Sequence, residues 1–282
     1  MAWVRNLLKV LFVAFQEERG GGKTTLVSHL IPAERRNRIL NLLQKEGSVQ
    51  VAALSDLLGV SEVTIRRDLD LLDQKGLLER THGGAVLSRR MRVEPSYTAK
   101  YQSYLEEKRK IGIAAAALVD PGETIFIHSG STTLQIFRHL AGKKVRVITS
   151  NAGAIAECQG LDIELFLIGG YYREQSHSLI GPLSILSLQR VYASKSFIGV
   201  DGISIKYGLT TPNLEEAEVA RTMIERTRGQ VIVVADHSKL GVVADCATAP
   251  IEKVDVLVID ADLDEGYRHD LENLGIKVVI AR

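Results

Sequence analysis

The stretch that decides the N-terminal fold reads Val60-Ser61-Glu62-Val63-Thr64-Ile65-Arg66-Arg67-Asp68-Leu69. Ser61 is a favoured helix N-cap, because its hydroxyl can accept a hydrogen bond from a free first-turn amide. Apolar residues at helical spacing follow it and predict an inward face. A second amphipathic helix, over residues 51–58, ends just before, at Gly59-Val60. A short turn that contains Gly between two amphipathic helices predicts a helix-turn-helix.

Outward from this stretch, residues 31–88 are predicted to form a small winged helix-turn-helix domain. An earlier helix spans residues 33–45, with Ile39, Leu42 and Leu43 on one face. Residues 77–87 place two short apolar runs around a polar centre with Gly83 and Gly84. This pattern is typical of a β-hairpin and predicts the wing.

The exposed face of the helix after Ser61 carries the candidate DNA-reading residues. The first residues of such a helix meet base edges in the major groove, where arginine can bond guanine through two donors. The alternative is a solvated face on which Arg66 and Arg67 pair with Glu62 and Asp70. Residues 31–92 carry an excess of positive charge, which would strengthen binding to phosphates. We expect DNA contacts from Arg35, Ser61, Glu62, Thr64, Arg66, Arg67, Arg80 and His82.

Composition limits the remaining possibilities. The 282 residues are 45% hydrophobic and 24% charged, as in a soluble globular protein. The net charge of +1 leaves only local evidence for a nucleic-acid partner. Cys158 and Cys246 are the only cysteines, which excludes a disulfide-dense scaffold and a four-cysteine zinc site. We therefore expect a cytoplasmic protein without a metal ion or other cofactor.

Residues 1–30 differ in character from the rest of the chain, and we expect a disordered leader or an over-called start. The apolar run from Leu7 to Phe15 is about half of the roughly 20 residues that cross a bilayer, so no membrane partner is expected. Gly22-Lys23-Thr24 resembles the end of a phosphate-binding loop, but that motif requires glycine where this chain has Glu17.

From residue 108, short β-branched runs alternate with helical stretches. This alternation predicts βαβ units and a larger open α/β domain over residues 108–282, with a mostly parallel sheet. Residues 89–107 are charged and irregular, so we expect a linker between the two domains. The predicted strands are residues 124–127, 145–149, 164–168, 196–200, 230–235, 254–259 and 277–280.

Polar residues follow five of these strands, at the edge of an open sheet where ligands bind. A Gly/Ser/Thr-rich turn after residue 127 can cradle an anion with its backbone amides, although an ordinary N-cap turn has the same composition. A cation near a second strand end can clamp a phosphate. Together they predict a composite site for a small phosphorylated polyol. The candidate residues are Ser129, Gly130, Ser131, Thr132, Thr133, Asn151, Gly169, Gly170, Arg173, Asp201, Gly202, Glu216 and Lys239.

Both halves of the chain resemble the DeoR family of bacterial sugar-metabolism regulators. The N-terminal resemblance rests on Thr64-Ile65-Arg66-Arg67-Asp68-Leu69 and on His82-Gly83-Gly84-Ala85, at matching spacing. The C-terminal resemblance rests on 129–133, 149–151, 169–170 with Arg173, 181–182, 197–202, 208–210, 215–218 and 236–239. It implies an effector domain related to ribose-phosphate isomerase that senses a phosphorylated sugar.

Two positions depart from the family pattern, which commonly has Asp where this chain has His128 and Ser194. His128 lies beside the predicted ligand turn. A charged imidazole there would make phosphate binding pH-sensitive, whereas a packed neutral imidazole would not, and we favour the packed, neutral form.

The function predicted from these features is transcriptional regulation, most simply repression relieved by a sugar phosphate. The expected partners are operator DNA, a phosphorylated sugar or a related intermediate, and further copies of the chain in a dimer or tetramer. The alternative is a sugar-phosphate isomerase or deaminase fused to a DNA-binding domain, for which Asp201, Glu216 and Lys239 are suitable residue types. We expect no enzyme activity, because Leu214-Glu215-Glu216-Ala217 replaces the Gly-rich, lysine-bearing segment of such isomerases.

Overall fold

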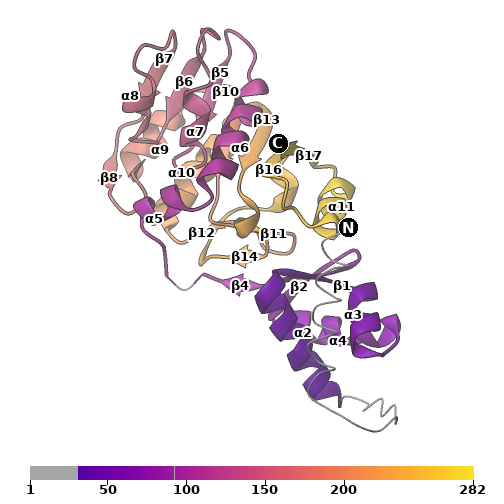
Figure 1. The fold of residues 1–282 in the computed structure, drawn as a ribbon. Coiled ribbons are helices and arrows are strands. Elements are labelled where there is room, and N and C mark those ends of the chain that lie inside the picture. The colour runs from indigo at the N-terminus through magenta and orange to yellow at the C-terminus, as the bar shows by residue number, and fades with distance from the viewer. Residues whose placement is uncertain (1–30, 92) are drawn as a thin grey trace. The chain divides into compact units, whose positions relative to one another are not determined.

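The computed structural model describes residues 31–91 and 93–282, so the predictions for residues 1–30 lie outside it. Its N-terminal part contains the predicted helix-turn-helix (Figure 1). Gly59 ends the first helix of the pair in the left-handed conformation, at φ 65°, and Ser61 caps the second by accepting from the amide of Thr64. The elements are α2 (Pro32–Glu46), β1 (Ser48–Gln50), α3 (Val51–Leu58), α4 (Glu62–Gln74), β2 (Leu78–Thr81) and β3 (Gly84–Leu87).

The wing is a three-stranded antiparallel sheet in the order β1-β3-β2. The sequence predicted β2 and β3 but not β1, which is three residues long and lies between two helices. Gly84 is required here, because a Cβ atom at this position would lie 1.9 Å from the carbonyl oxygen of Val49. Ile39, Leu43, Ile65 and other buried residues of the three helices and the wing form one apolar core.

The segment predicted as a linker contains secondary structure. It begins with β4 (Arg89–Arg90), and α5 (Tyr97–Gln102) and α6 (Leu105–Ala117) follow. Ser96 caps α5 by accepting from the amide of Ala99 at 3.3 Å. No residue of α5 is buried, whereas α6 buries Ile111 and its neighbours against the large sheet.

All seven predicted strands are present and form one parallel sheet, in the order β17-β16-β13-β10-β5-β6-β7 (Figure 1). The predicted open α/β architecture is therefore confirmed. The strands are β5 (Thr124–Ile127), β6 (Arg146–Thr149), β7 (Glu164–Leu167), β10 (Ala193–Gly199), β13 (Thr227–Val234), β16 (Val256–Asp260) and β17 (Lys277–Ala281).

Alternating side chains of the strands divide the core into two layers. Ile125 and Ile127 pack with α6 and α7 (Leu134–Phe137) on one face, while Phe126 packs on the opposite face. That second face is covered by α9 (Pro182–Leu188), α10 (Leu214–Glu225) and α11 (Glu265–Asn273). A further short helix, α8 (Ala154–Glu157), contributes Ala154 to the first layer.

The winding direction reverses between β5 and β10. Along the chain the sheet grows from β5 through β6 to β7 on one side, and then from β10 through β13 to β17 on the other. The carboxyl ends of β5 and β10 therefore diverge into separate loops at a topological switch point, the usual ligand position in open α/β sheets.

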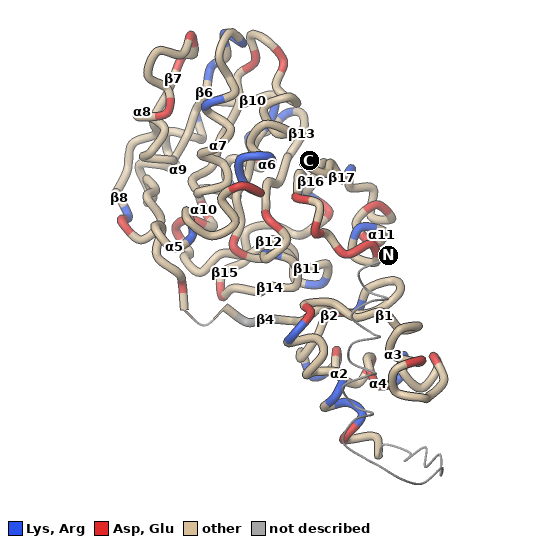
Figure 2. The backbone as a smooth tube through the Cα atoms, in the orientation of Figure 1, with Lys and Arg blue, Asp and Glu red and all other residues tan. Residues whose placement is uncertain are grey.

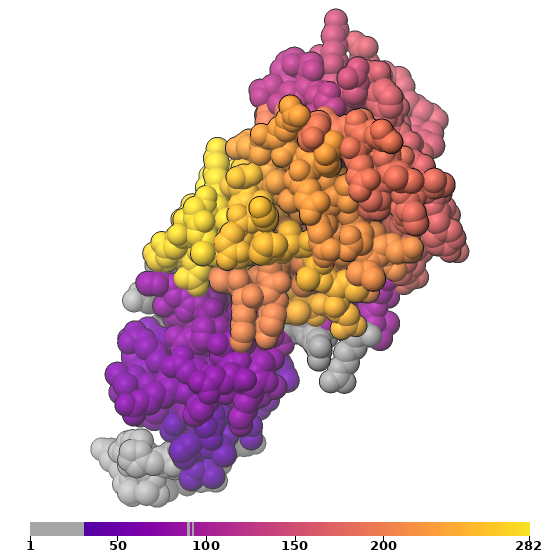
Figure 3. Space-filling model, turned by 180° about the vertical axis from the view of Figure 1, so that it is seen from behind, coloured from indigo at the N-terminus to yellow at the C-terminus, as the bar shows by residue number. Residues whose placement is uncertain are grey.

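Smaller strands extend the domain beyond the sheet and were not predicted. They are β8 (Tyr171–Arg173) with β9 (Ser178–Ile180), the sheet β11 (Gly202–Ser204), β12 (Gly208–Thr211) and β15 (Cys246–Ala249), and β14 (Val242–Val243). β14 pairs in parallel with β4, and the amide of Met91 donates to the carbonyl of Val243 at 2.9 Å. Seen from behind, α11 lies against the wing (Figure 3), where the amide of His82 donates to Asp270 at 2.8 Å.

None of the helices in the described ranges combines the length and apolar character that a bilayer span requires.

Candidate nucleic-acid interface and ligand pocket

The candidate DNA-reading face lies on α4. Arg66 pairs with Glu62 at 2.7 Å, and 54% of its side chain is exposed. Arg67 is exposed, and its guanidinium has no hydrogen-bond or ion-pair partner among the described residues. Thr64 is half-buried, with its hydroxyl 3.0 Å from that of Ser61. Because an exposed ion pair contributes at most about 1 kcal/mol, Arg66 can exchange Glu62 for a nucleic-acid partner at little cost.

Arg35 has a different position from the predicted one. Its guanidinium is buried and bonds the buried carboxylate of Asp68, which ties α2 to α4. The backbone-phosphate role predicted for Arg35 is therefore replaced by a structural one. The other basic residues of α2 are blue in Figure 2; Arg38 and Lys45 are exposed, and Arg36 is half-buried.

The two wing candidates also have protein partners. Arg80 donates to Asp70 at 2.9 Å and to the carbonyl of Arg66 at 3.1 Å, so it braces the wing against α4. The ring of His82 lies 4.2 Å from that of His269 on α11. His82 therefore contacts α11 on one side while its side chain stays exposed.

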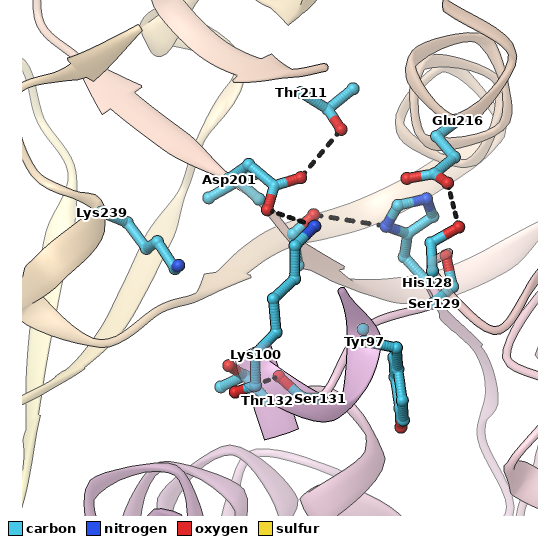
Figure 4. Close-up of a pocket in the computed structure, with 14 residues that line it drawn as sticks. Tyr97, Lys100, His128, Ser129, Ser131, Thr132, Asp201, Thr211, Glu216 and Lys239 are labelled. Carbon is cyan, nitrogen blue, oxygen red and sulfur yellow. Dashed lines mark hydrogen bonds and ion pairs between the residues drawn. The ribbon is translucent and has the colours of Figure 1, made fainter. Parts of the chain in front are cut away.

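A pocket opens at the switch point between β5 and β10 (Figure 4). It brings together seven of the thirteen predicted ligand residues, from the turn after β5, the end of β10, α10 and the short helix after β13. Those seven are Ser129, Gly130, Ser131, Thr132, Asp201, Glu216 and Lys239. The remaining lining residues are Tyr97, Lys100, His128, Ser176, Gly199, Val200 and Thr211.

The turn after β5 offers backbone donors. Within the described parts of the chain, the amides of Gly130, Ser131, Thr132 and Thr133 have no acceptor. The amide of Ser129 is instead used, donating to the hydroxyl of Ser150 at 2.9 Å. The following helix α7 has only four residues. The free amides, rather than a long helix dipole, therefore make this turn suited to an anion.

Two lysines face the pocket with different partners. The Nζ of Lys100 lies 2.8 Å from Asp201 and 3.3 Å from Glu94. The ammonium of Lys239 has no ion pair or hydrogen bond within the described ranges. Burial acts to raise the pKa of Asp201, but the charge of Lys100 outweighs it and holds the pKa below its usual value. Asp201 is therefore ionised, while Lys239 remains available for an incoming anion.

Arg173 does not reach the pocket. Its guanidinium lies 3.0 Å from Glu216 and also binds Glu94 and the hydroxyl of Ser176. The predicted phosphate clamp is therefore an internal support, since three protein groups already use its donors. Glu216 also accepts from Ser176 and Ser178, and burial raises the pKa of its carboxyl despite these bonds.

His128 is buried beside the ligand turn. Its Nδ1 lies 3.2 Å from the carbonyl oxygen of Gly199, so Nδ1 carries the proton and donates. Its Nε2 is buried and has no partner within the described residues. Burial lowers the pKa of His128 to about 4. The imidazole is therefore neutral near pH 7, which agrees with the packed alternative and leaves Nε2 as a hydrogen-bond acceptor.

Other predicted residues support the pocket from behind. Thr133 and Asn151 both donate to the carbonyl of Gly130, each at 3.0 Å, and fix the turn. Gly170 and Gly202 allow close packing, because a Cβ atom would lie 2.2 Å from Ser184 Oγ and 2.3 Å from the carbonyl of Val242, respectively. These residues and Gly169 do not line the pocket. Ser194, the second departure, bonds Glu123 away from the site.

Lys100 and Tyr97 are two of the pocket residues that were not predicted from the sequence. Both lie on α5, in the segment predicted as an irregular linker. The signal that was available is Ser96, a good N-cap before a run without proline or glycine. Thr211 was also missed, and its hydroxyl donates to Asp201 at 3.0 Å.

Two groups of side chains have a composition suited to a metal ion: His82, His269 and Asp270, and His237, Asp260 and Asp262. In the second group, His237 Nδ1 lies 2.7 Å from Asp260, and this hydrogen bond raises the pKa of His237. The described residues of this group therefore form a hydrogen-bonded pair of imidazole and carboxylate.

The two parts of the fold define a class of protein: a transcriptional regulator with a winged helix-turn-helix and an α/β sensor domain. The comparisons with known proteins agree. The family model described as DeoR C terminal sensor domain matches residues 103–261, and the DeoR-like helix-turn-helix domain matches residues 35–90. The chain belongs to the DeoR family.

Curated relatives of similar length are transcriptional regulators. The HTH-type transcriptional regulator GlpR of Haloferax volcanii is 36% identical over 251 residues, covering 89% of this chain and 98% of that protein. A putative aga operon transcriptional repressor of Escherichia coli O157:H7 is also 36% identical, covering 88% and 93%. The HTH-type transcriptional repressor GlcR of Bacillus subtilis is 32% identical, covering 88% and 95%.

A solved structure with partial similarity is ribose 5-phosphate isomerase A from Methanocaldococcus jannaschii. It is 19% identical, with a TM-score of 0.36, and the match covers 49% of this chain and 55% of the isomerase.

Proposed function

We propose that this regulator is a repressor that binds operator DNA through α4 and releases it when a phosphorylated sugar or related intermediate enters the pocket at the switch point. The observation that carries the effector class is the composition of that pocket. Free amides and Lys239 offer donors to a phosphate, while Asp201, Glu216 and His128 Nε2 offer acceptors to hydroxyl groups. A ligand that satisfies both ends carries a phosphate and several hydroxyls.

The DNA half of the proposal is tested with Arg66→Ala/Arg67→Ala and labelled duplexes drawn from upstream of the protein's own operon. Each arginine that contacts a base contributes about 1–3 kcal/mol, so the double variant is expected to bind at least roughly tenfold more weakly. Arg138→Ala/Arg146→Ala is the matched control, because both arginines lie in the α/β domain, are about half exposed and pair with carboxylates of that domain. Equal affinity of the wild type and the α4 variant would refute the assignment.

The effector half is tested by calorimetric titration with glucose 6-phosphate, fructose 6-phosphate, ribose 5-phosphate and glycerol 3-phosphate. At least one is expected to bind, and Lys239→Ala is expected to weaken it, because a charge-assisted hydrogen bond to phosphate is lost. Lys110→Ala removes an exposed lysine of α6 as the control. If Lys239→Ala binds the compound with the same affinity as the wild type, the phosphate does not contact Lys239.

We further propose that the protein acts as a dimer or tetramer, because the two half-sites of an operator need two recognition helices. Sedimentation of the protein with and without operator DNA tests the assembly size, and a monomer that binds the full operator with undiminished affinity would refute it.

We propose that the protein is not an enzyme, because its two candidate bases already have hydrogen-bond partners in the protein. Asp201 is bonded by Lys100 and Thr211, and Glu216 by Arg173 and two serines. Both carboxylates are thus engaged by protein donors, which favours a hydrogen-bonding role over that of a general base. Steady isomerisation or deamination of a sugar phosphate by the purified protein would overturn this exclusion.

A further inference from the structure

Residues 94–103, which we call the strap, form one wall of the ligand pocket. They comprise Glu94 and Pro95, the cap Ser96, α5 and Ser103. Figure 4 shows Lys100 projecting from this segment to Asp201, and Tyr97 also lines the pocket. No residue of α5 is buried, so the strap is held by side-chain contacts and not by a core of its own.

Those contacts are polar and few. Glu94 pairs with Arg173, and its carbonyl accepts from Gln175 at 3.1 Å. Tyr97 stacks on His177 with ring centres 4.1 Å apart. At the other end, the ammonium of Lys108 on α6 donates to the carbonyls of Lys100 and Ser103. The side chains of Glu94, Lys100 and Lys108 in these contacts are largely buried, but α5 itself buries no residue. Segments with few buried apolar contacts open at lower free energy than core strands, so we expect the strap to be the wall that moves.

The opposite walls are much more firmly fixed. The turn after β5 is held by Thr133, Asn151 and Ser150, which are all completely buried. His128 is bonded across to β10 through Gly199. Displacing this side of the pocket would break buried hydrogen bonds next to the core, each costing about 1–3 kcal/mol when a group is left unsatisfied.

The free space between the walls is small. Its volume is about 50 Å³, less than that of a cavity of about 150 Å³ that binds benzene. A sugar phosphate is larger than benzene, so we expect the ligand of the proposed function to bring the pocket walls, the strap among them, to new positions.

We infer that Lys100 is a ligand-binding residue of the strap, and that its transfer from Asp201 to the phosphorylated ligand moves the segment that leads to the DNA-binding domain. This inference rests on the proposed function. A hydroxyl that donates to Asp201 replaces the bond from Lys100, and the released ammonium then pairs with the phosphate. The strap continues backwards along the chain to β4, which directly follows the wing. Because β4 is itself paired with β14 of the α/β domain, movement of the strap would have to shift that pairing at the base of the wing.

The experiment measures DNA release and ligand affinity separately. Labelled operator duplex is bound, and glucose 6-phosphate, fructose 6-phosphate, ribose 5-phosphate and glycerol 3-phosphate are each titrated to saturation. For a compound that releases the wild type, Lys100→Met is expected to lower ligand affinity at least roughly tenfold. It is also expected to leave part of the DNA bound at saturation, because the strap no longer follows the ligand. Lys100→Arg keeps the positive charge and is expected to restore release.

Two further variants separate coupling from binding. His128→Asn alters the fixed wall, so it is expected to reach full release at saturation whatever its affinity. Lys110→Met removes an exposed lysine outside the pocket and is expected to match the wild type. If Lys100→Met lowers the melting temperature strongly, Lys100→Gln and Lys100→Arg carry the comparison.

The outcomes distinguish this inference from the proposed function. If none of the four compounds binds the wild type, the proposed function and this inference are both refuted. If a compound binds and releases the wild type and Lys100→Met behaves identically, only the inference falls. If Lys100→Met weakens binding but releases all DNA at saturation, the strap does not transmit the signal and that part of the inference is wrong.

Discussion

The burial of His128 predicts a specific pH dependence of stability. Burial lowers the pKa of His128 to about 4 in the folded protein, whereas an unfolded histidine has a pKa of about 6.5. As the pH falls below about 6.5, the imidazole of His128 is therefore protonated in the unfolded chain but stays neutral in the folded chain. The stabilising effect of the neutral imidazole is complete above that pH and is lost progressively toward pH 4.

The magnitude is set by the two pKa values. Lowering the pH from about 7.5 to about 5 stabilises the unfolded state by about 2 kcal/mol through this one residue, rising to about 3 kcal/mol below pH 4. His237 has the opposite sign, because Asp260 raises its pKa. A histidine with a raised pKa stabilises the fold at low pH, and this contribution is lost as the pH rises through its folded-state pKa.

The assay compares urea unfolding of the wild type and His128→Asn at both pH values and one protein concentration. Asparagine keeps a donor for the carbonyl of Gly199 but does not titrate, and His237 is common to both proteins. We expect the wild type to lose about 2 kcal/mol more than the variant on acidification. Equal losses in the two proteins would show that His128 is protonated in the folded state, and would refute the neutral imidazole.

Three further predictions concern the winged helix-turn-helix. Arg35→Ala leaves Asp68 buried without its cation and is expected to destabilise the protein by about 3 kcal/mol in urea unfolding; retained stability would show that the pair is solvated. Ser61→Ala removes the cap of α4 and is expected to cost about 1 kcal/mol, measured in the same way, with Ser187→Ala on an exposed helix position as the control. Gly84→Ala is expected to cost at least about 2 kcal/mol, because its methyl group would meet the carbonyl of Val49; a melting temperature equal to the wild type would show that the wing can shift.

The sequence was most informative where periodicity is strong. The seven strands of the parallel sheet are apolar runs covered on both faces, and their existence was predictable from these runs alone. β1 and the hairpin of β8 and β9 were not, because three-residue strands are too short to show a period. Their pairing depends on partners distant in the chain.

The pocket was predictable in part for a related reason. Strand ends mark Ser129, Asp201 and Lys239, because parallel strands bring their carboxyl ends to one edge. Lys100 and Tyr97 approach that edge from a segment without periodicity, and their positions are fixed by tertiary contacts. Arg173 shows the converse limit: a cation at a strand end indicates a possible clamp, but only the structure shows Glu94 and Glu216 using its donors.

Because the winding reverses between β5 and β10, the strand order forms the crevice, and the loops supply the side chains that line it. The crevice exists because the chain turns in opposite directions there, and no particular side chain is needed to create it. Exchanges at residues such as 128 or 239 can therefore redirect recognition to another metabolite while the buried strands keep the architecture unchanged. Substitution of the residues that line the pocket can therefore produce regulators with a new effector on the same fold.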